Sequence, residues 1–123
     1  MQFQQDPNHL NVHVKSYQAG KIIINDQEYT ENIAFSSEQI LTDIPLPKDW
    51  SNLSPETIKQ LCDTTPEVII IGTGSAFQIL PTKLLVEAAK YHLTLDVMDS
   101  AAACRTFTVL AAEGRKVVTC IFL

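Results

Sequence analysis

Directly after a run of β-branched residues, the chain has a short glycine turn, Gly72-Thr73-Gly74-Ser75. The backbone N–H groups of such a turn, helped by its two hydroxyls, can hold an anion. Open α/β sheets place their ligand-binding loops after buried strands. The turn fails as a dinucleotide motif, because Phe77 stands where the third glycine belongs, and the chain has no P-loop. A structural tight turn and a ligand contact both stay open, and a lone Gly-x-Gly favours the first.

A second group of polar residues lies at and just after the end of another predicted strand, where a helix opens: Asp99, Ser100, Arg105 and Thr106. If the two strands are parallel neighbours, this group faces the glycine turn. Arg105 would then bind an anion, and Asp99 would orient its guanidinium group. In the alternative, which we favour, Asp99 or Ser100 caps the helix and Arg105 is solvated or paired with a carboxylate. The candidate ligand-binding residues are therefore Gly72, Thr73, Gly74, Ser75, Asp99, Ser100, Arg105 and Thr106.

The sequence predicts no catalytic residue, no metal site and no cofactor. Cys104 falls in the first turn of that helix, where the helix dipole can lower the pKa of a thiol. It has no Cys-x-x-Cys partner, so we interpret it as a buried or half-buried thiol. His9, His13 and His92 do not form a metal site, because no cysteine or carboxylate completes the ligand group. There is no Gly-x-Ser-x-Gly motif and no evident Ser–His–Asp set.

Composition indicates one acidic globular domain, which we assign to residues 1–123. The chain has 9 basic and 14 acidic residues, a net charge of −5, and 46% hydrophobic residues. This balance argues against nucleic acid as a partner. The N-terminus lacks a secretory signal, and no apolar run is long enough to insert into a membrane. Three widely spaced cysteines indicate reduced thiols, and we expect a cytoplasmic protein.

The first part of the chain reads as short strands. Alternating or β-branched residues predict strands at 11–17, 21–25, 28–35 and 39–44. Turns are expected at Ala19-Gly20 and Asn25-Asp26. Pro45 and Pro47 end this region, and we expect Trp50 to anchor the following connection on the core.

The second part alternates helices and strands. Ser54 and Pro55 begin a helix over 55–62, and further helices are predicted over 81–92 and 101–113, the last ending at Gly114. The intervening strands are 67–71, 93–97 and 117–122. The first of these is continuously β-branched, which indicates a central strand covered on both faces. We expect right-handed crossovers with helices covering the sheet.

Three segments give the sequence a family resemblance. They are Ile70-Ile71-Gly72-Thr73-Gly74, the run from Val97 to Leu110, and Glu113-Gly114-Arg115-Lys116-Val117. With them the chain resembles the Mth-domain family, long catalogued as a domain of unknown function. The resemblance implies an α/β fold in which a mixed central sheet has helices on one side and an added small β layer from the N-terminal strands.

The resemblance also implies a function, because the family is not known for catalysis and includes a mitochondrial complex I assembly factor that acts with a partner protein. Our leading hypothesis is a non-catalytic accessory or binding protein, with a role in assembling a respiratory NADH dehydrogenase-type complex. The alternative is a protein or enzyme that binds an anion or nucleotide-like small molecule between the 72–75 turn and residues 99–105. Exposed edges of the N-terminal strands make a homodimer plausible.

Overall fold

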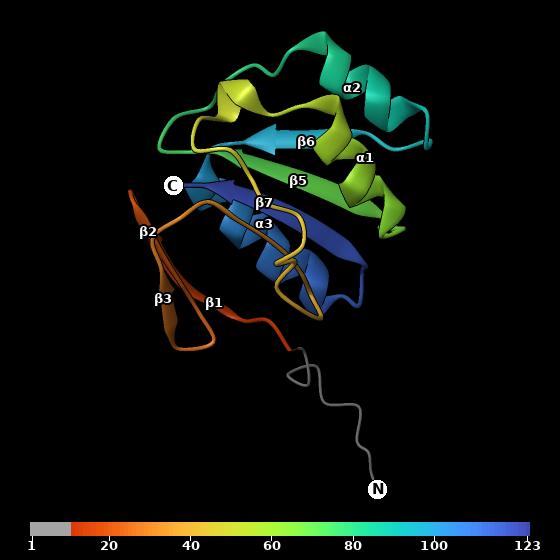
Figure 1. The fold of residues 1–123 in the computed structure, drawn as a ribbon. Helices are drawn as coiled ribbons and strands as arrows, with labels where there is room; N and C mark the ends of the chain where they lie inside the picture. The colour runs from red at the N-terminus through yellow and green to blue at the C-terminus, as the bar shows by residue number, and fades with distance from the viewer. Residues whose placement is uncertain (1–10) are drawn as a thin grey trace, which may run out of the picture.

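A computed structural model describes residues 11–123 of the chain and contains two sheets (Figure 1). The smaller sheet is antiparallel and consists of β1 (Val14–Gln18), β2 (Lys21–Ile24) and β3 (Gln27–Tyr29), in the order β1-β2-β3. The larger sheet consists of β4 (Ile33–Ser36), β5 (Val68–Thr73), β6 (Leu95–Met98) and β7 (Val117–Phe122), in the order β4-β7-β5-β6. In it, β5 is parallel to both β6 and β7, and β4 is antiparallel to β7. The predicted mixed central sheet and additional small β layer are confirmed.

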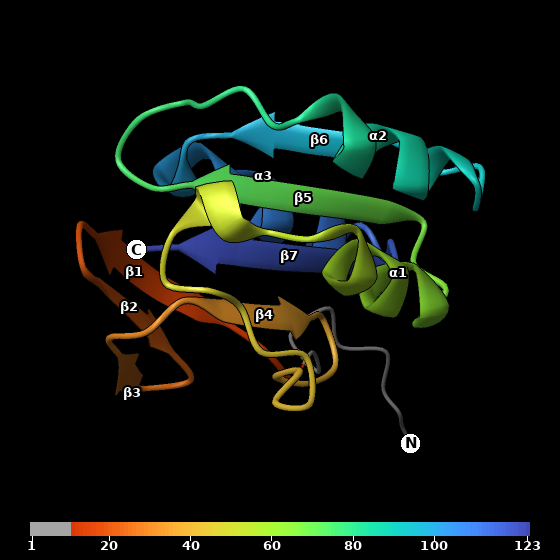
Figure 2. The same cartoon turned by 45° about the horizontal axis from the view of Figure 1, so that its top comes forward.

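The helices cover both faces of the central sheet, so the expectation of helices on one side is wrong. The helical elements are a 3-10 turn, η2 (Trp50–Asn52), and three α-helices, α1 (Pro55–Asp63), α2 (Thr82–Ala89) and α3 (Ser100–Ala112). Figures 1 and 2 show α1 and α2 on one face, and α3 on the other together with the small sheet.

The order of the strands explains this arrangement. The chain passes from β5 to its neighbour β6 through α2, and then returns past β5 to β7 through α3. Right-handed crossovers that run in opposite directions along a sheet place their helices on opposite faces. One helix on each face is therefore what these two connections require.

Strand β5 has the buried environment that its β-branched run predicts. Ile69 and Ile71 pack in one apolar cluster with α1 and α2, and Ile70 packs in the other with α3 and the small sheet. All three side chains are fully buried. Because successive side chains of a strand point to opposite faces, both faces of β5 need apolar cover.

Two of the predicted N-terminal strands are wrong. The predicted strand 28–35 is divided between β3 and β4, which lie in different sheets. Asn32 stands in the intervening turn, where its side chain donates to the carbonyls of Pro47 and Lys48 and accepts from the N–H of Leu123. The predicted strand 39–44 is reduced to a single bridge between Phe35 and Ile40.

The predicted helix signals and the tryptophan anchor are confirmed. Ser54 accepts from the N–H of Thr57 at the start of α1, with Pro55 at the first helical position. Gly114 follows α3 with a φ of 81°, a left-handed conformation suited to glycine. Trp50 is half-buried against the cluster formed with α1 and α2.

Candidate functional site

The glycine turn and the start of α3 meet where β5 and β7 end. The Oγ of Ser100 accepts from the N–H of Gly74 at 2.8 Å and donates to the carbonyl of Phe122 at 2.7 Å. The N–H of Ser100 donates to the carbonyl of Gly74 at 2.8 Å. One buried serine therefore ties α3 to two strands, and the turn's Gly74 N–H group is directed at protein oxygen.

Positions 72 and 74 are both glycine, for different steric reasons. A Cβ on Gly72 would lie 2.9 Å from the Cα and Oγ of Ser100 and 3.0 Å from the Cβ of Ala103, so this position lets α3 approach the strand. Gly74 has a φ of 96°, which other residues rarely adopt.

Thr73 closes the turn from within. Its Oγ1 donates to the carbonyl of Ala76 at 2.8 Å and accepts from the N–H of Gln78 at 3.1 Å. The side chain is buried. Ser75 is exposed on the loop that follows.

Asp99 and Thr106 also have structural partners. Asp99 is the N-cap of α3, and its carboxylate accepts from the N–H of Ala102 at 2.9 Å, as the capping interpretation predicts. The Oγ1 of Thr106 donates to the Sδ of Met98 at 3.4 Å. Thus the structure brings Gly72, Gly74 and Ser100 into contact and turns Thr106 toward β6.

Arg105 has a different environment from the other predicted site residues. It is exposed, and in residues 11–123 it forms no ion pair. It lines a groove of about 500 Å³ between β1 and α3, together with Lys15, Tyr17 and Val109. Arg105 is the one predicted ligand-binding residue that lines this groove. Arg115, by contrast, lies beyond the end of α3 and pairs with Glu67 at 2.9 Å.

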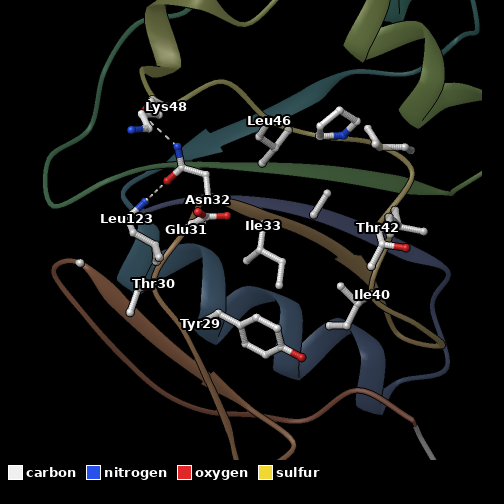
Figure 3. A pocket seen from close by; sticks show the side chains of 15 residues that line it. Tyr29, Thr30, Glu31, Asn32, Ile33, Ile40, Thr42, Leu46, Lys48 and Leu123 are labelled. Atoms are coloured by element: carbon white, nitrogen blue, oxygen red, sulfur yellow. Dashed lines mark hydrogen bonds between the residues drawn. The ribbon is translucent and has the colours of Figure 1, made fainter.

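A second, larger groove of about 690 Å³ lies between the residues that link β3 to β4 and the segment 40–48. Figure 3 shows Tyr29, Ile33 and Ile40 among its lining side chains. Charged Glu31 and Lys48 lie at the same groove, and both are exposed.

The cysteines are unsuited to nucleophilic chemistry. All three are buried and unpaired. Burial raises the pKa of the Cys104 thiol to about 11, and the nearby Arg105 guanidinium only partly opposes this. Burial raises the pKa of Cys120 to about 12. A thiol with such a pKa is protonated at neutral pH, and the thiolate is the reactive form.

Within residues 11–123, no group of three or more His, Cys, Asp or Glu side chains is placed to hold a metal ion. His9, one of the three histidines considered from the sequence, lies outside the described residues. No helix of that part of the chain is long and apolar enough to cross a membrane.

Comparison with known families gives a match over residues 14–122, to the proteins of unknown function DUF498/DUF598. The chain belongs to this family. A Bordetella pertussis structure with a TM-score of 0.80 and 22% identity, covering 99% of this chain and 92% of that one, is described as an Mth-like domain. At this identity the likeness shows the shared fold. The resemblance to the Mth-domain family is confirmed.

This DUF498 member is similar in sequence to two relatives that carry different names. The 13 kDa major membrane protein of Francisella tularensis is 30% identical over 123 residues, which cover all of this chain and 99% of that protein. Assembly factor 3 of the NADH dehydrogenase (ubiquinone) 1 alpha subcomplex from Danio rerio is 33% identical over 67 residues. That match covers 53% of this chain and 38% of the zebrafish protein.

Solved structures extend the likeness over nearly the whole DUF498 chain. A crystal structure from Bordetella parapertussis has a TM-score of 0.83 at 27% identity, and covers 94% of this chain and 98% of that one. An NMR structure from Xanthomonas campestris has a TM-score of 0.82 at 25% identity, and covers 97% and 89%.

Sequence reasoning missed both grooves of this DUF498 protein. Lys15 and Tyr17 lie near α3 because the small sheet packs beside this helix. No local sequence pattern predicts that packing. One signal was available: Val109 follows Arg105 by four residues, so both lie on one stripe of the helix. On the α3 side of the β1–α3 groove, an exposed apolar residue, Val109, therefore lies beside Arg105, which is unpaired in the described part of the chain. The Val109 side chain is 56% exposed.

Proposed function

We propose that this protein is a non-catalytic accessory protein that binds a partner protein and assists the assembly of a respiratory NADH dehydrogenase-type complex. The observation that carries the proposal is the 33% identity, over 67 residues, to the zebrafish protein named as an assembly factor of that complex. The match spans 38% of the zebrafish protein, so the role is transferred to this chain as a hypothesis.

The chemistry of the described residues supports binding over catalysis. The hydroxyl of Thr73, the N–H of Gly74 and the hydroxyl of Ser100 are engaged within the fold. The buried Cys104 and Cys120 have raised pKa values that keep their thiols protonated. Phe77 and Ile79, in the loop before α2, are 57% and 80% exposed, and exposed apolar side chains of this size favour contact with a partner.

Deletion of the gene in the source organism tests the proposal. We expect less fully assembled NADH dehydrogenase on native gels, and restoration when the full chain is supplied. Capture of the tagged chain at native expression level should recover a subunit or another assembly protein. Normal assembly after deletion, with only ribosomal and chaperone background in the capture, would contradict the proposal.

The proposal includes a cytoplasmic location, which the three buried, unpaired cysteines favour, because reduced thiols are typical of cytosolic proteins. The Francisella relative is named a membrane protein, so the location needs its own measurement. Fractionation of cells at low and high salt should recover the chain in the cytoplasmic fraction. Retention in the membrane fraction at both salt concentrations would contradict this location.

The alternative function stays a prediction. It is binding of an anion or nucleotide-like molecule by residues of the 72–75 turn and of 99–105. Ser75 and Arg105 are the exposed members of that set. Thermal-shift screening with nucleotides, phosphates and acidic metabolites tests it, because a ligand at 100 times its Kd adds about 2.7 kcal/mol of stability. The absence of any shift, in wild type and Arg105→Ala alike, would count against it.

A further inference from the structure

The groove between β1 and α3 runs along the edge of a strand. Four consecutive residues of β1 line it: Val14, Lys15, Ser16 and Tyr17. Successive side chains of a strand point to opposite faces, so a groove that touches all four follows the strand's edge. A bulge between Val14 and Ser16 shifts the register with β2, which brings Val14 and Tyr17 to the same apolar cluster.

The backbone of this edge is unpaired in the described part of the chain. β1 is the outer strand of the small sheet, and its neighbour on the inner side is β2. Within residues 11–123, no backbone hydrogen bond joins residues 14–18 to any segment except β2. Figure 1 shows α3 alongside the small sheet. The free edge therefore faces a groove with a helix as its other wall, an arrangement suited to the addition of an extended peptide strand.

The helical wall is an amphipathic stripe. Ala101, Arg105 and Val109 are four residues apart and lie on one side of α3, and Thr108 lies beside them. Val109 is 56% exposed. Arg105 forms no ion pair within the described residues. The opposite wall contributes a second cation, Lys15, whose pair with Asp26 at 2.7 Å is solvent-exposed and therefore weak.

We propose that this groove binds an extended segment of a partner protein in which apolar and acidic side chains alternate. The segment adds to the edge of β1 as a fourth strand of the small sheet. Its acidic side chains face Arg105 and Lys15, and its apolar side chains cover Val14 and Val109. The inference deepens the proposed function, since it names the chemistry by which the assembly partner is recognised.

Charge complementarity selects this occupant over a second copy of the chain. A second β1 would bring another Lys15 to a groove that already holds Lys15 and Arg105. Like charges placed opposite one another across a strand pair are destabilising. An acidic segment instead finds two cations on a protein whose net charge is −5.

Titration of the isotope-labelled full chain with a capped peptide of about seven residues, alternating valine and glutamate, tests the proposal by NMR. We expect amide shift changes at residues 14–18 and along the stripe 101–109. Arg105→Ala should weaken binding about fivefold, which corresponds to one exposed charge pair of about 1 kcal/mol. Lys59→Ala is the matched control, because Lys59 is an exposed helical cation on α1, outside the groove, and should leave binding unchanged.

Two altered peptides separate strand addition from simple charge attraction. A peptide N-methylated at alternate residues keeps its charges but loses the donors that pair with β1, and it should not bind. A peptide with lysine in place of glutamate should not bind either. The proposal would be overturned if the N-methylated peptide bound as well as the unmodified one. It would also be overturned if amide shift changes were confined to the groove at residues 29–48, or if none occurred up to about 1 mM peptide. The proposal would also be overturned if the free chain formed a dimer whose affinity changed in Lys15→Glu, because the edge of β1 would then be the dimer interface.

The outcomes also separate this inference from the proposed function. If deletion of the gene impairs complex assembly but the peptide does not bind, the groove proposal fails and the assembly role stands. If the peptide binds at β1 but deletion leaves assembly intact, the groove is a peptide site that serves another partner. The assembly role then fails.

Discussion

Two regions of α3 use their polar groups in opposite ways. At its first residue, Ser100 is fully buried and holds both Gly74 and the end of β7 through its hydroxyl. Five residues later, Arg105 is exposed at the groove beside β1 and forms no ion pair in residues 11–123. The buried region, which we call the junction, stabilises the fold, whereas the groove retains groups that a partner can use.

The helix geometry explains why neighbours in sequence take such different roles. Five residues correspond to about 140° of rotation around an α-helix. The side of α3 that carries Ser100, Ala103 and Phe107 faces the core. Arg105 and Val109 fall on a different side, which borders the groove. A cluster of polar residues in sequence is therefore not a cluster in space unless the helical period agrees.

Removal of the Ser100 hydroxyl should have the largest effect at the junction. Ser100→Ala leaves the N–H of Gly74 and the carbonyl of Phe122 without their partner. Each buried unsatisfied group costs about 1–3 kcal/mol, so we expect a loss of about 3 kcal/mol in the free energy of unfolding, measured with urea. Ser75→Ala, at an exposed serine of the same turn, is the control and should lose less than about 0.5 kcal/mol. Equal effects of the two changes would contradict the assignment of Ser100.

Addition of one methyl group at Gly72 should have the next largest effect. In Gly72→Ala the new Cβ meets the backbone of Ser100 at 2.9 Å, so α3 must move away from β5. Overpacking of this kind costs about 1–3 kcal/mol. Gly20→Ala makes a useful comparison, because Gly20 has a φ of 87° and nothing within 4 Å, which leaves only the backbone strain. A Gly72 variant as stable as wild type would show that the close approach is not required.

Local patterns in the sequence predicted much of the fold. The β-branched run of β5 and the capping residues Ser54 and Asp99 act over a few residues, and each specifies its own element. The division of 28–35 into β3 and β4 was not predictable in this way. It depends on Asn32, whose amide links residues 47, 48 and 123, and those contacts exist only in the folded chain.

The candidate site shows the same limit more sharply. The residue types at the glycine turn were suitable for an anion, and β5 and β6 meet the condition of being parallel neighbours. What the sequence could not specify is that the hydroxyl of Ser100 itself accepts from the turn's N–H group. Prediction of the β1–α3 groove would have required the position of the small sheet beside α3. That position depends on packing between residues about 90 positions apart in the sequence.

Alkaline pH should reduce stability through the buried thiols. The unfolded thiol ionises near pH 8.5, whereas burial raises the folded pKa of Cys104 to about 11 and that of Cys120 to about 12. Between these values the folded chain holds protons that the unfolded chain has lost, so stability is complete below about pH 8.5 and falls as pH rises. For fully buried Cys120 the slope approaches about 1.4 kcal/mol per pH unit.

Urea unfolding at a series of pH values measures this slope. Cys120→Ala should have a shallower dependence on pH above pH 9, even if it is less stable at pH 7 because of the smaller side chain. Cys104→Ala should change the slope in the same direction but by less, since Cys104 lies next to the Arg105 guanidinium and is less completely buried. Identical slopes in all three proteins would contradict the burial of these thiols.

Loss of the Arg105 side chain should have the smallest effect on stability, and this result would sharpen the contrast between the two regions of α3. Arg105 is exposed and unpaired in the described part of the chain, so Arg105→Ala should change the free energy of unfolding by less than about 0.5 kcal/mol. Val109→Ser, on the same stripe, should behave alike, because Val109 is already 56% exposed. A loss comparable to that of Ser100→Ala would place Arg105 among the groups that hold the fold together. The groove would then no longer differ from the junction, because its cation would already be engaged in the free protein.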